Sequence, residues 1–558
     1  MITENSREQR KSGSAERDGE GEMRSLYYNG AVYTGTMPLV EAFVVEDGIF
    51  CFAGSNEEAR TAAGPDAVMT DLEGRFVCPA FNDSHMHLLE FGQGLYAPQV
   101  EAHTSSLGEL LNRLRDFEKK YPRREGEWLV ARGWNQDDFT DVRRMPDRWD
   151  LDKVSQNIPI CVVRMCGHCL TVNSKALELL GVTADSVQPE GGRIGMENGA
   201  PDGRFYENAV RLVYDVIPQP DREELKKMIL AACRVLNSYG ITCCQTDDYG
   251  AFRGVSWQTI NKVYRELEKN GDLTVRIYEQ CNFEEPEELR EFVESGYRTG
   301  IGSDFFRIGP LKIVADGALG ARTAYLSRPY ADAPYTCGMM SFPQETLEEM
   351  ISYANEQGMQ IAVHAIGDGC LDRVLAAFEK ALKEHPRRDH RHGIVHCQIT
   401  RPDQLEQIRQ LKLHVYSQSI FLDYDIRIVE ARVGKEMAAT SYNWKTLLCG
   451  GVSVSNGSDC PIEAPHVMSG IQCAVTRCTL DGTGPYLPEQ AYTVQEALES
   501  YTVRGAEACF GEERMGQIRA GMLADFAVLG ANPFETEPGR LKEIPVCATY
   551  LGGRKVFG

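Results

Sequence analysis

The sequence predicts an α/β protein: a (β/α)8 barrel of the TIM type, with a β-sandwich domain formed from both termini and an inserted subdomain. Two observations lead to this prediction. In the middle of the chain, short apolar runs alternate with amphipathic segments, which is the pattern of a parallel sheet covered by helices. At both ends of the chain, short apolar runs alternate with turn residues instead, which is the pattern of antiparallel strands.

The two ends of the chain are assigned first. The chain has 558 residues, enough for roughly two to four structural units. Residues 1–24 are polar and contain no apolar stretch, so we expect a disordered tail without an export signal. Residues 25–79 and 515–558 carry the strand-and-turn pattern. We therefore predict that these two segments form one composite β-sandwich.

The barrel is predicted for residues 80–514, with its chemistry at the carboxyl ends of the strands. The first strand is placed at VCPAF, residues 77–81. Seven further strand-like runs lie at 241–246, 273–278, 311–316, 360–365, 393–398, 413–418 and 451–456. The first two runs are about 160 residues apart, far more than one crossover connection requires. An inserted subdomain at about 100–225 explains this gap.

Composition limits the partners and the compartment. The formal net charge is −22, which argues against a nucleic-acid partner because phosphate neutralisation needs clustered Lys and Arg. The chain contains no run of about 18 apolar residues, so we expect no membrane span. Its 18 cysteines and the lack of an export signal indicate a cytoplasmic protein. The oligomeric state is left open, with a homodimer as one option.

Histidines and an aspartate lie where strands are predicted to end. His85 and His87 follow the first strand, and alternate strand residues point to the same side. His364, His396 and Asp459 lie in or just after three other strands, in a chain that has only 11 histidines. Neutral imidazoles and carboxylates bind zinc and similar divalent ions. We therefore predict a centre of one or two divalent metal ions, zinc being expected.

Lys312 lies in the strand-like run at 311–316. A lysine ammonium has no free lone pair and cannot bind a metal ion. Carbamylation by CO2 would convert the amine into a carboxylate that can bridge two ions, and sequence does not reveal such a modification. An ordinary salt bridge at the barrel rim is the alternative. Both interpretations are left open by the residues themselves.

The chain carries five further motifs: DSHMH at 83–87, LKIVADGALGARTA at 311–324, AVHAIGDG at 362–369, IVHCQ at 394–398 and NGSDCPIE at 456–463. Together they resemble the amidohydrolase superfamily, and in particular its branch that includes N-substituted formamide deformylase. The resemblance covers nearly the whole chain and implies a barrel with a sandwich built from both termini. It also implies the metal-ligand roles given above, with Lys312 as a bridging carbamate.

The candidate substrate-binding residues are His168, Trp134, Arg322 and Asp316, which lie in segments that fit the family. A buried structural histidine is the alternative for His168. The same segment spells CGHC, as in disulfide isomerases. Met165 stands where the redox motif usually has Trp, and the segment lies in the insertion, so a redox role is disfavoured.

The expected reaction is hydrolysis of the C–N bond of a non-peptide amide, in particular a small or medium-sized N-substituted one, by a metal-activated water, with Asp459 as the catalytic base and acid. A deaminase or a cyclic-amide hydrolase of the same superfamily is the alternative. Deaminating relatives usually have Glu three residues after the histidine that corresponds to His364, and this chain has Gly367 there. A non-catalytic assembly protein is a third interpretation, disfavoured because this chain keeps every ligand.

Overall fold

In a computed structural model of the chain, the described residues are 24–98, 100, 105–123, 126–142, 144–164, 169–189, 191–252 and 254–558. The chain divides into two compact units. The first contains Met1–Met86, Arg234–Thr246 and Thr274–Gly558, and the second contains His87–Cys233 and Asp247–Leu273. Within the described residues, no helix combines the length and the apolar character that crossing a bilayer requires.

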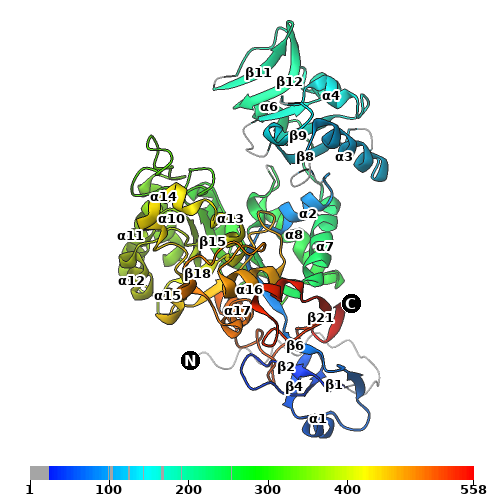
Figure 1. Cartoon of the computed structure of the whole chain (residues 1–558), viewed down its shortest axis with the longest axis vertical. Helices are drawn as coiled ribbons and strands as arrows, with labels where there is room; N and C mark the ends of the chain where they lie inside the picture. The colour runs from blue at the N-terminus through cyan, green and yellow to red at the C-terminus, as the bar shows by residue number, and fades with distance from the viewer. Residues whose placement is uncertain are drawn as a thin grey trace. The chain divides into compact units, whose positions relative to one another are not determined.

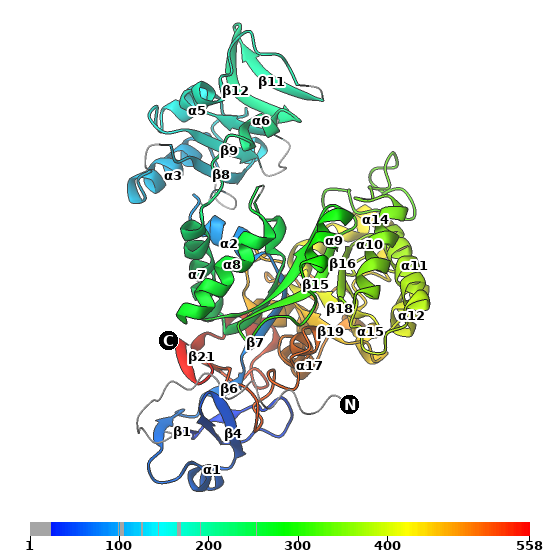
Figure 2. The same cartoon turned by 180° about the vertical axis from the view of Figure 1, so that it is seen from behind.

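The first unit is built on a sheet of eight parallel strands, as predicted, and the sheet curves into a nearly closed barrel (Figure 2). A hydrogen bond of 2.8 Å from Ser455 Oγ to Ser84 Oγ joins the two end strands. In order around the sheet, the strands are β7 (Phe81–Met86), β13 (Ile241–Thr246), β14 (Arg276–Asn282), β15 (Phe306–Val314), β16 (Ile361–Ala365), β17 (Gly393–His396), β18 (His414–Ser417) and β19 (Val454–Asn456).

The predicted strands differ from the observed ones mainly in their bounds. The run at 241–246 is β13 residue for residue, whereas the run at 273–278 precedes the start of β14 by three residues. The first strand was placed wrongly: residues 76–79 form β6 (Phe76–Pro79), which pairs with β20 (Phe526–Leu529) outside the barrel. The barrel strand β7 follows after one residue. Because both strands are short and apolar, sequence alone does not separate them.

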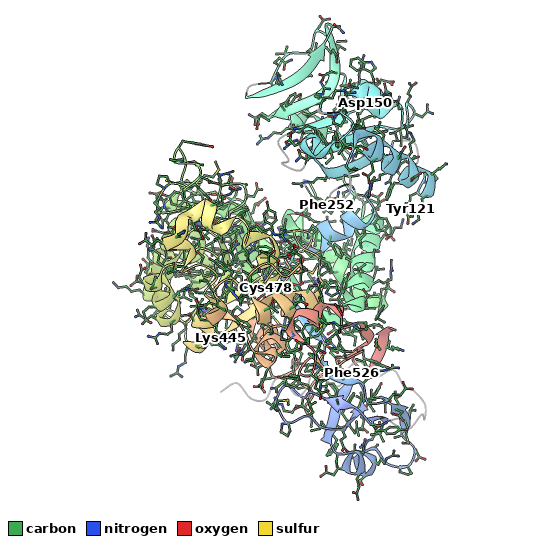
Figure 3. The ribbon with its side chains drawn as sticks, in the orientation of Figure 1. Tyr121, Asp150, Phe252, Lys445, Cys478 and Phe526 are labelled. Atoms are coloured by element: carbon green, nitrogen blue, oxygen red, sulfur yellow. The ribbon has the colours of Figure 1, made fainter. Side chains whose placement is uncertain are left out.

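Helices cover the outside of the barrel sheet (Figure 2). In α11, the buried Leu371, Val374, Leu375 and Phe378 recur every three or four residues, so one face packs inward. Lys445, labelled in Figure 3, forms an ion pair with Glu496 and joins α15 to α17. The helices between β14 and the C-terminal strands are α9 (Pro286–Glu294), α10 (Gln344–Glu356), α11 (Asp368–Glu384), α12 (Pro402–Gln410), α13 (Leu422–Asp425), α14 (Val429–Ala438), α15 (Trp444–Cys449), α16 (Val467–Thr476), α17 (Val494–Ser500) and α18 (Val503–Ala508).

Two smaller sheets of the first unit pack together from both termini (Figure 1). Tyr27 stacks on Phe43 with ring centroids 4.9 Å apart, and Phe43 meets Phe526 edge-on at 4.9 Å. Phe526 is labelled in Figure 3. One sheet has the order β4 (Ile49–Gly54), β3 (Ala42–Glu46), β1 (Ser25–Tyr28), β5 (Val68–Asp71), and α1 (Asn56–Ala63) joins its last two strands in sequence. The other has the order β2 (Ala31–Val32), β6, β20, β21 (Val546–Leu551), β22 (Arg554–Phe557).

The second unit contains a five-stranded sheet of its own. Its strand order is β11 (Gly192–Glu197), β12 (Ala200–Glu207), β10 (Cys169–Val172), β9 (Ile160–Arg164), β8 (Leu129–Trp134). The helices that lie wholly in this unit are α2 (Leu88–Leu95), α3 (Leu107–Lys120), α4 (Arg148–Asp152), α5 (Ser174–Leu180), α6 (Val210–Tyr214) and α8 (Trp257–Asn270), and α7 (Arg222–Ser238) begins in it.

Candidate metal centre

Three ligand-type side chains meet at the carboxyl ends of barrel strands. His85 lies near the end of β7, His396 ends β17, and Asp459 follows β19. Their exposed fractions are 0%, 2% and 6%, and one possible ligand atom from each lies within 4.8 Å of the others. Carboxyl ends of barrel strands surround one axis, so residues far apart in the sequence come together here.

The surroundings of His85 suit a bound cation. Its Nδ1 lies 2.8 Å from Gln280 Oε1, and its Nε2 lies 3.1 Å from Asp459 Oδ1. A neutral imidazole that donates from Nδ1 keeps a lone pair on Nε2, which then faces a carboxylate oxygen. The separation is close to that of two ligands of a tetrahedral zinc ion, about 3.3 Å for bonds near 2.0 Å. The donor set therefore fits a divalent ion.

His396 has a matching environment at the end of β17. Its Nδ1 lies 2.8 Å from Gln418 Oε1. Burial, and secondarily the neighbouring His364, holds the pKa of His396 well below its usual value, so the ring is neutral at neutral pH and can bind a metal ion. His396 and Asp459 both have a positive φ, 73° and 58°, as strained residues at functional sites often do. A 2.8 Å hydrogen bond from the backbone N–H of Asp459 to the carbonyl oxygen of His85 holds the backbone at Asp459 in this conformation.

The other predicted ligands are placed as follows. His364 on β16 lies with its ring centroid 4.5 Å from that of His396, and its Nε2 is 3.1 Å from the carbonyl oxygen of Gly317. Lys312 on β15 is buried at 1% exposure, and its charge contributes to lowering the pKa of His396. His87, in the second unit, precedes α2 and pairs with Asp247 of the same unit.

Comparison with known proteins decides the family. The model of the amidohydrolase family matches residues 69–557. The chain belongs to the amidohydrolase family.

Relatives of this amidohydrolase match along nearly its whole length. It is 31% identical over 545 residues to the putative amidohydrolase YtcJ of Bacillus subtilis, covering 96% of this chain and 99% of the relative. It is 25% identical to the N-substituted formamide deformylase of Arthrobacter pascens, covering 92% and 94%. An uncharacterised metal-dependent hydrolase from Pyrococcus furiosus has a similar crystal structure, with 29% identity, a TM-score of 0.76, and 92% and 100% coverage.

Asp316 joins two loops of this amidohydrolase by hydrogen bonds, and substrate contact stays a prediction for it. It is 1% exposed, and both carboxylate oxygens accept backbone N–H groups. The donors are Tyr325 at 2.8 Å, Ile366 at 3.0 Å and Gly367 at 2.9 Å. Asp316 therefore joins the loop after β15 to the loop after β16, and it also lies 3.3 Å from Nε2 of His364.

The remaining predicted substrate contacts have different surroundings. Trp134 is fully buried in the core of the second unit, where it stacks on Phe139, and substrate contact stays a prediction for it. Arg322 is partly exposed and forms a bidentate ion pair with Asp332 at 3.0 and 2.9 Å. Substrate contact stays a prediction for Arg322. His168 lies outside the described residues.

The sequence interpretation missed three polar residues of this centre. Gln280 and Gln418 bond to the two buried histidines. Asp83 accepts from Ser458 Oγ at 2.5 Å and from Ser458 N at 3.0 Å, and burial raises its pKa to about 7. A signal existed, since each is a polar residue in or just after an apolar strand. That pattern does not predict which metal-ligand residue each of the three contacts.

Proposed function

We propose that this amidohydrolase hydrolyses the carbon–nitrogen bond of a small N-substituted amide with the help of one or two divalent ions, zinc being expected. The observation that carries the proposal is the convergence of His85, His396 and Asp459, all buried, at carboxyl ends of barrel strands. His87, His364 and Lys312 are proposed to complete the ligand set. The name of the Arthrobacter relative, N-substituted formamide deformylase, supports the substrate class.

The ion, when bound, would polarise the carbonyl group and lower the pKa of a water molecule toward neutrality. Asp459 is proposed as the group that accepts the proton of the attacking water and delivers one to the leaving nitrogen. Its carboxylate lies 3.1 Å from His85 Nε2, and its backbone N–H is bonded to the carbonyl of His85. The carboxylate is thereby held among the ligands, where a base would have to lie.

Lys312 is proposed to act as a carbamate. Its side chain is buried and close enough to His396 to help lower the pKa of that ring, and an unmodified ammonium there would repel a divalent ion. Reaction of the amine with CO2 would replace that positive charge with a carboxylate that offers two oxygens. This is the form in which Lys312 can join the ligand set.

A feature at Gly367 disfavours deamination. A Cβ atom at Gly367 would lie 2.0 Å from Tyr325 O and 2.4 Å from Tyr325 C, well inside van der Waals contact. Its N–H also donates to Asp316 at 2.9 Å. The loop geometry therefore leaves no room at this position for the Glu that deaminating relatives usually have. Hydrolysis of an amide does not require that side chain.

The test is a matched substrate panel on purified protein loaded with zinc or manganese and checked by elemental analysis. N-substituted formamides, their N-acetyl analogues with the same amine, and cyclic amides are compared by amine release, and ring amines by ammonia release. We expect amine release from at least one amide class and its loss in His396→Asn. Ammonia release from ring amines alone would overturn the proposal in favour of deamination. Failure to bind a stoichiometric metal ion would overturn the metal centre.

A further inference from the structure

Two buried glutamines flank the two buried histidines of the centre. Gln280 lies on β14 and Gln418 directly follows β18, two strands that contribute none of the predicted ligands. Gln280 Oε1 lies 2.8 Å from His85 Nδ1, and Gln418 Oε1 lies 2.8 Å from His396 Nδ1. Both glutamines are fully buried, so water does not compete for these bonds.

The orientation of each side-chain amide is set by its other end. Gln280 Nε2 donates to the backbone carbonyl of Ser84 at 3.2 Å, and Gln418 Nε2 donates to that of Tyr416 at 3.1 Å. A carbonyl oxygen only accepts hydrogen bonds, so the NH2 group must lie on that side. The amide oxygen then faces the imidazole in both cases.

An amide oxygen also only accepts, so the imidazole nitrogen that faces it must carry the proton. Nδ1 is therefore the protonated nitrogen in both rings, and Nε2 keeps its lone pair while the ring is neutral. In His85 this Nε2 faces Asp459 Oδ1 at 3.1 Å. His364 has the opposite arrangement, because its Nε2 lies 3.1 Å from the carbonyl oxygen of Gly317.

We propose that Gln280 and Gln418 are positioning residues that hold His85 and His396 in the Nδ1–H tautomer, with Nε2 ready to bind the metal ion. This inference rests on the metal centre of the proposed function. Partners on the second nitrogen of a ligating histidine orient the ring and raise its basicity, and their loss typically weakens metal binding about 10- to 100-fold. Here two neutral amides, one on β14 and one directly after β18, four strands further around the barrel sheet, would share that task.

Gln280→Met and Gln418→Met test the proposal, because Met has a similar length and no carbonyl oxygen. Gln280→Glu and Gln418→Glu are the conservative variants, since a carboxylate still accepts from Nδ1–H. Gln245→Met is the matched control. Gln245 is a fully buried glutamine of β13 that bonds to Asn82 and to the carbonyl of Gly505, and among the described residues no histidine is recorded as its partner.

The first measurement is the zinc dissociation constant, by competition with a chelating dye, without any substrate. We expect each Met variant to bind zinc about 10- to 100-fold more weakly. The Glu variants should bind as tightly as the wild type or more tightly, and Gln245→Met should match the wild type. Equal affinity for the Gln280→Met, Gln418→Met and Gln245→Met variants would overturn the proposal.

The second measurement is nitrogen NMR of histidine-labelled, metal-free protein, with the two rings assigned by His85→Asn and His396→Asn. The wild type should show the Nδ1–H pattern for both rings, and each Met variant should lose it in its own ring only. A wild-type ring protonated at Nε2 would overturn the inference. If the wild type binds no zinc, the proposed metal centre is wrong. The nitrogen chemical shifts of the two histidine rings still decide whether the glutamines set the tautomers.

Discussion

Replacing Asp525 with Asn is expected to cost about 3–5 kcal/mol of the free energy of unfolding of the first unit, because it leaves a guanidinium buried without its counter-charge. Asp525 directly precedes the sandwich strand β20, and its partner Arg276 begins the barrel strand β14. The two residues are 6% and 4% exposed, and the bidentate pair has distances of 2.7 and 3.0 Å. The pair thus ties the barrel to the sandwich.

The magnitude follows from burial and geometry. At about 4 Å between charges and an effective dielectric constant of about 20, the attraction is roughly 4 kcal/mol. In the wild type, Gly552 N–H donates to Asp525 Oδ1 at 2.7 Å, and the amide oxygen of Asn can still accept this hydrogen bond. The lost stability therefore comes from the removed negative charge. The pair of Arg514 and Asp304 is the control, since its side chains are 52% and 47% exposed. Asp304→Asn should cost below about 1 kcal/mol.

The assay is urea unfolding at neutral pH, followed by circular dichroism, with the urea dependence of each variant compared. The urea concentration at the unfolding midpoint should fall strongly for Asp525→Asn and hardly for Asp304→Asn. The slope of the unfolding free energy against urea concentration should stay unchanged. The double variant Arg276→Met with Asp525→Leu should recover most of the loss, because two apolar side chains leave no buried charge. Equal small effects of Asp525→Asn and Asp304→Asn would refute the reasoning.

Three further predictions concern the centre and the pH dependence. Asp459→Asn should lower kcat about 10²–10⁴-fold by removing the base, while elemental analysis still finds metal; near-full activity would show that another group takes the proton. Lys312→Ala should lose activity, and short carboxylic acids should restore part of it by replacing the carbamate; full activity without them would contradict the bridge. Burial lowers the pKa of His414 from 6.5 to about 3, so its contribution to stability is complete above pH 6.5 and is lost as the pH falls toward 3, by about 1.4 kcal/mol per pH unit. Between pH 7 and pH 5, the free energy of unfolding of the wild type, measured by urea unfolding, should therefore fall by about 2 kcal/mol more than that of His414→Gln. Equal losses would contradict the assignment.

Much of the fold could be predicted because its signals are local. The run at 241–246 is apolar and short, and it forms β13 over the same residues. The alternation of such runs with amphipathic segments predicts the parallel barrel, since buried parallel strands and half-buried helices need these patterns. The order of strands around a barrel then follows the chain, so the carboxyl ends that bear His85, His396 and Asp459 had to meet.

The partners of these side chains were decided only by the tertiary structure. Gln280 bonds to His85 across 195 positions of sequence, and Arg276 bonds to Asp525 across 249. The sequence likewise does not show that Asp316 joins two loops or that Trp134 packs in a core. The physical reason is that periodicity depends on near neighbours along the chain, whereas the burial and the hydrogen-bond partner of a polar side chain depend on which distant strands close around it.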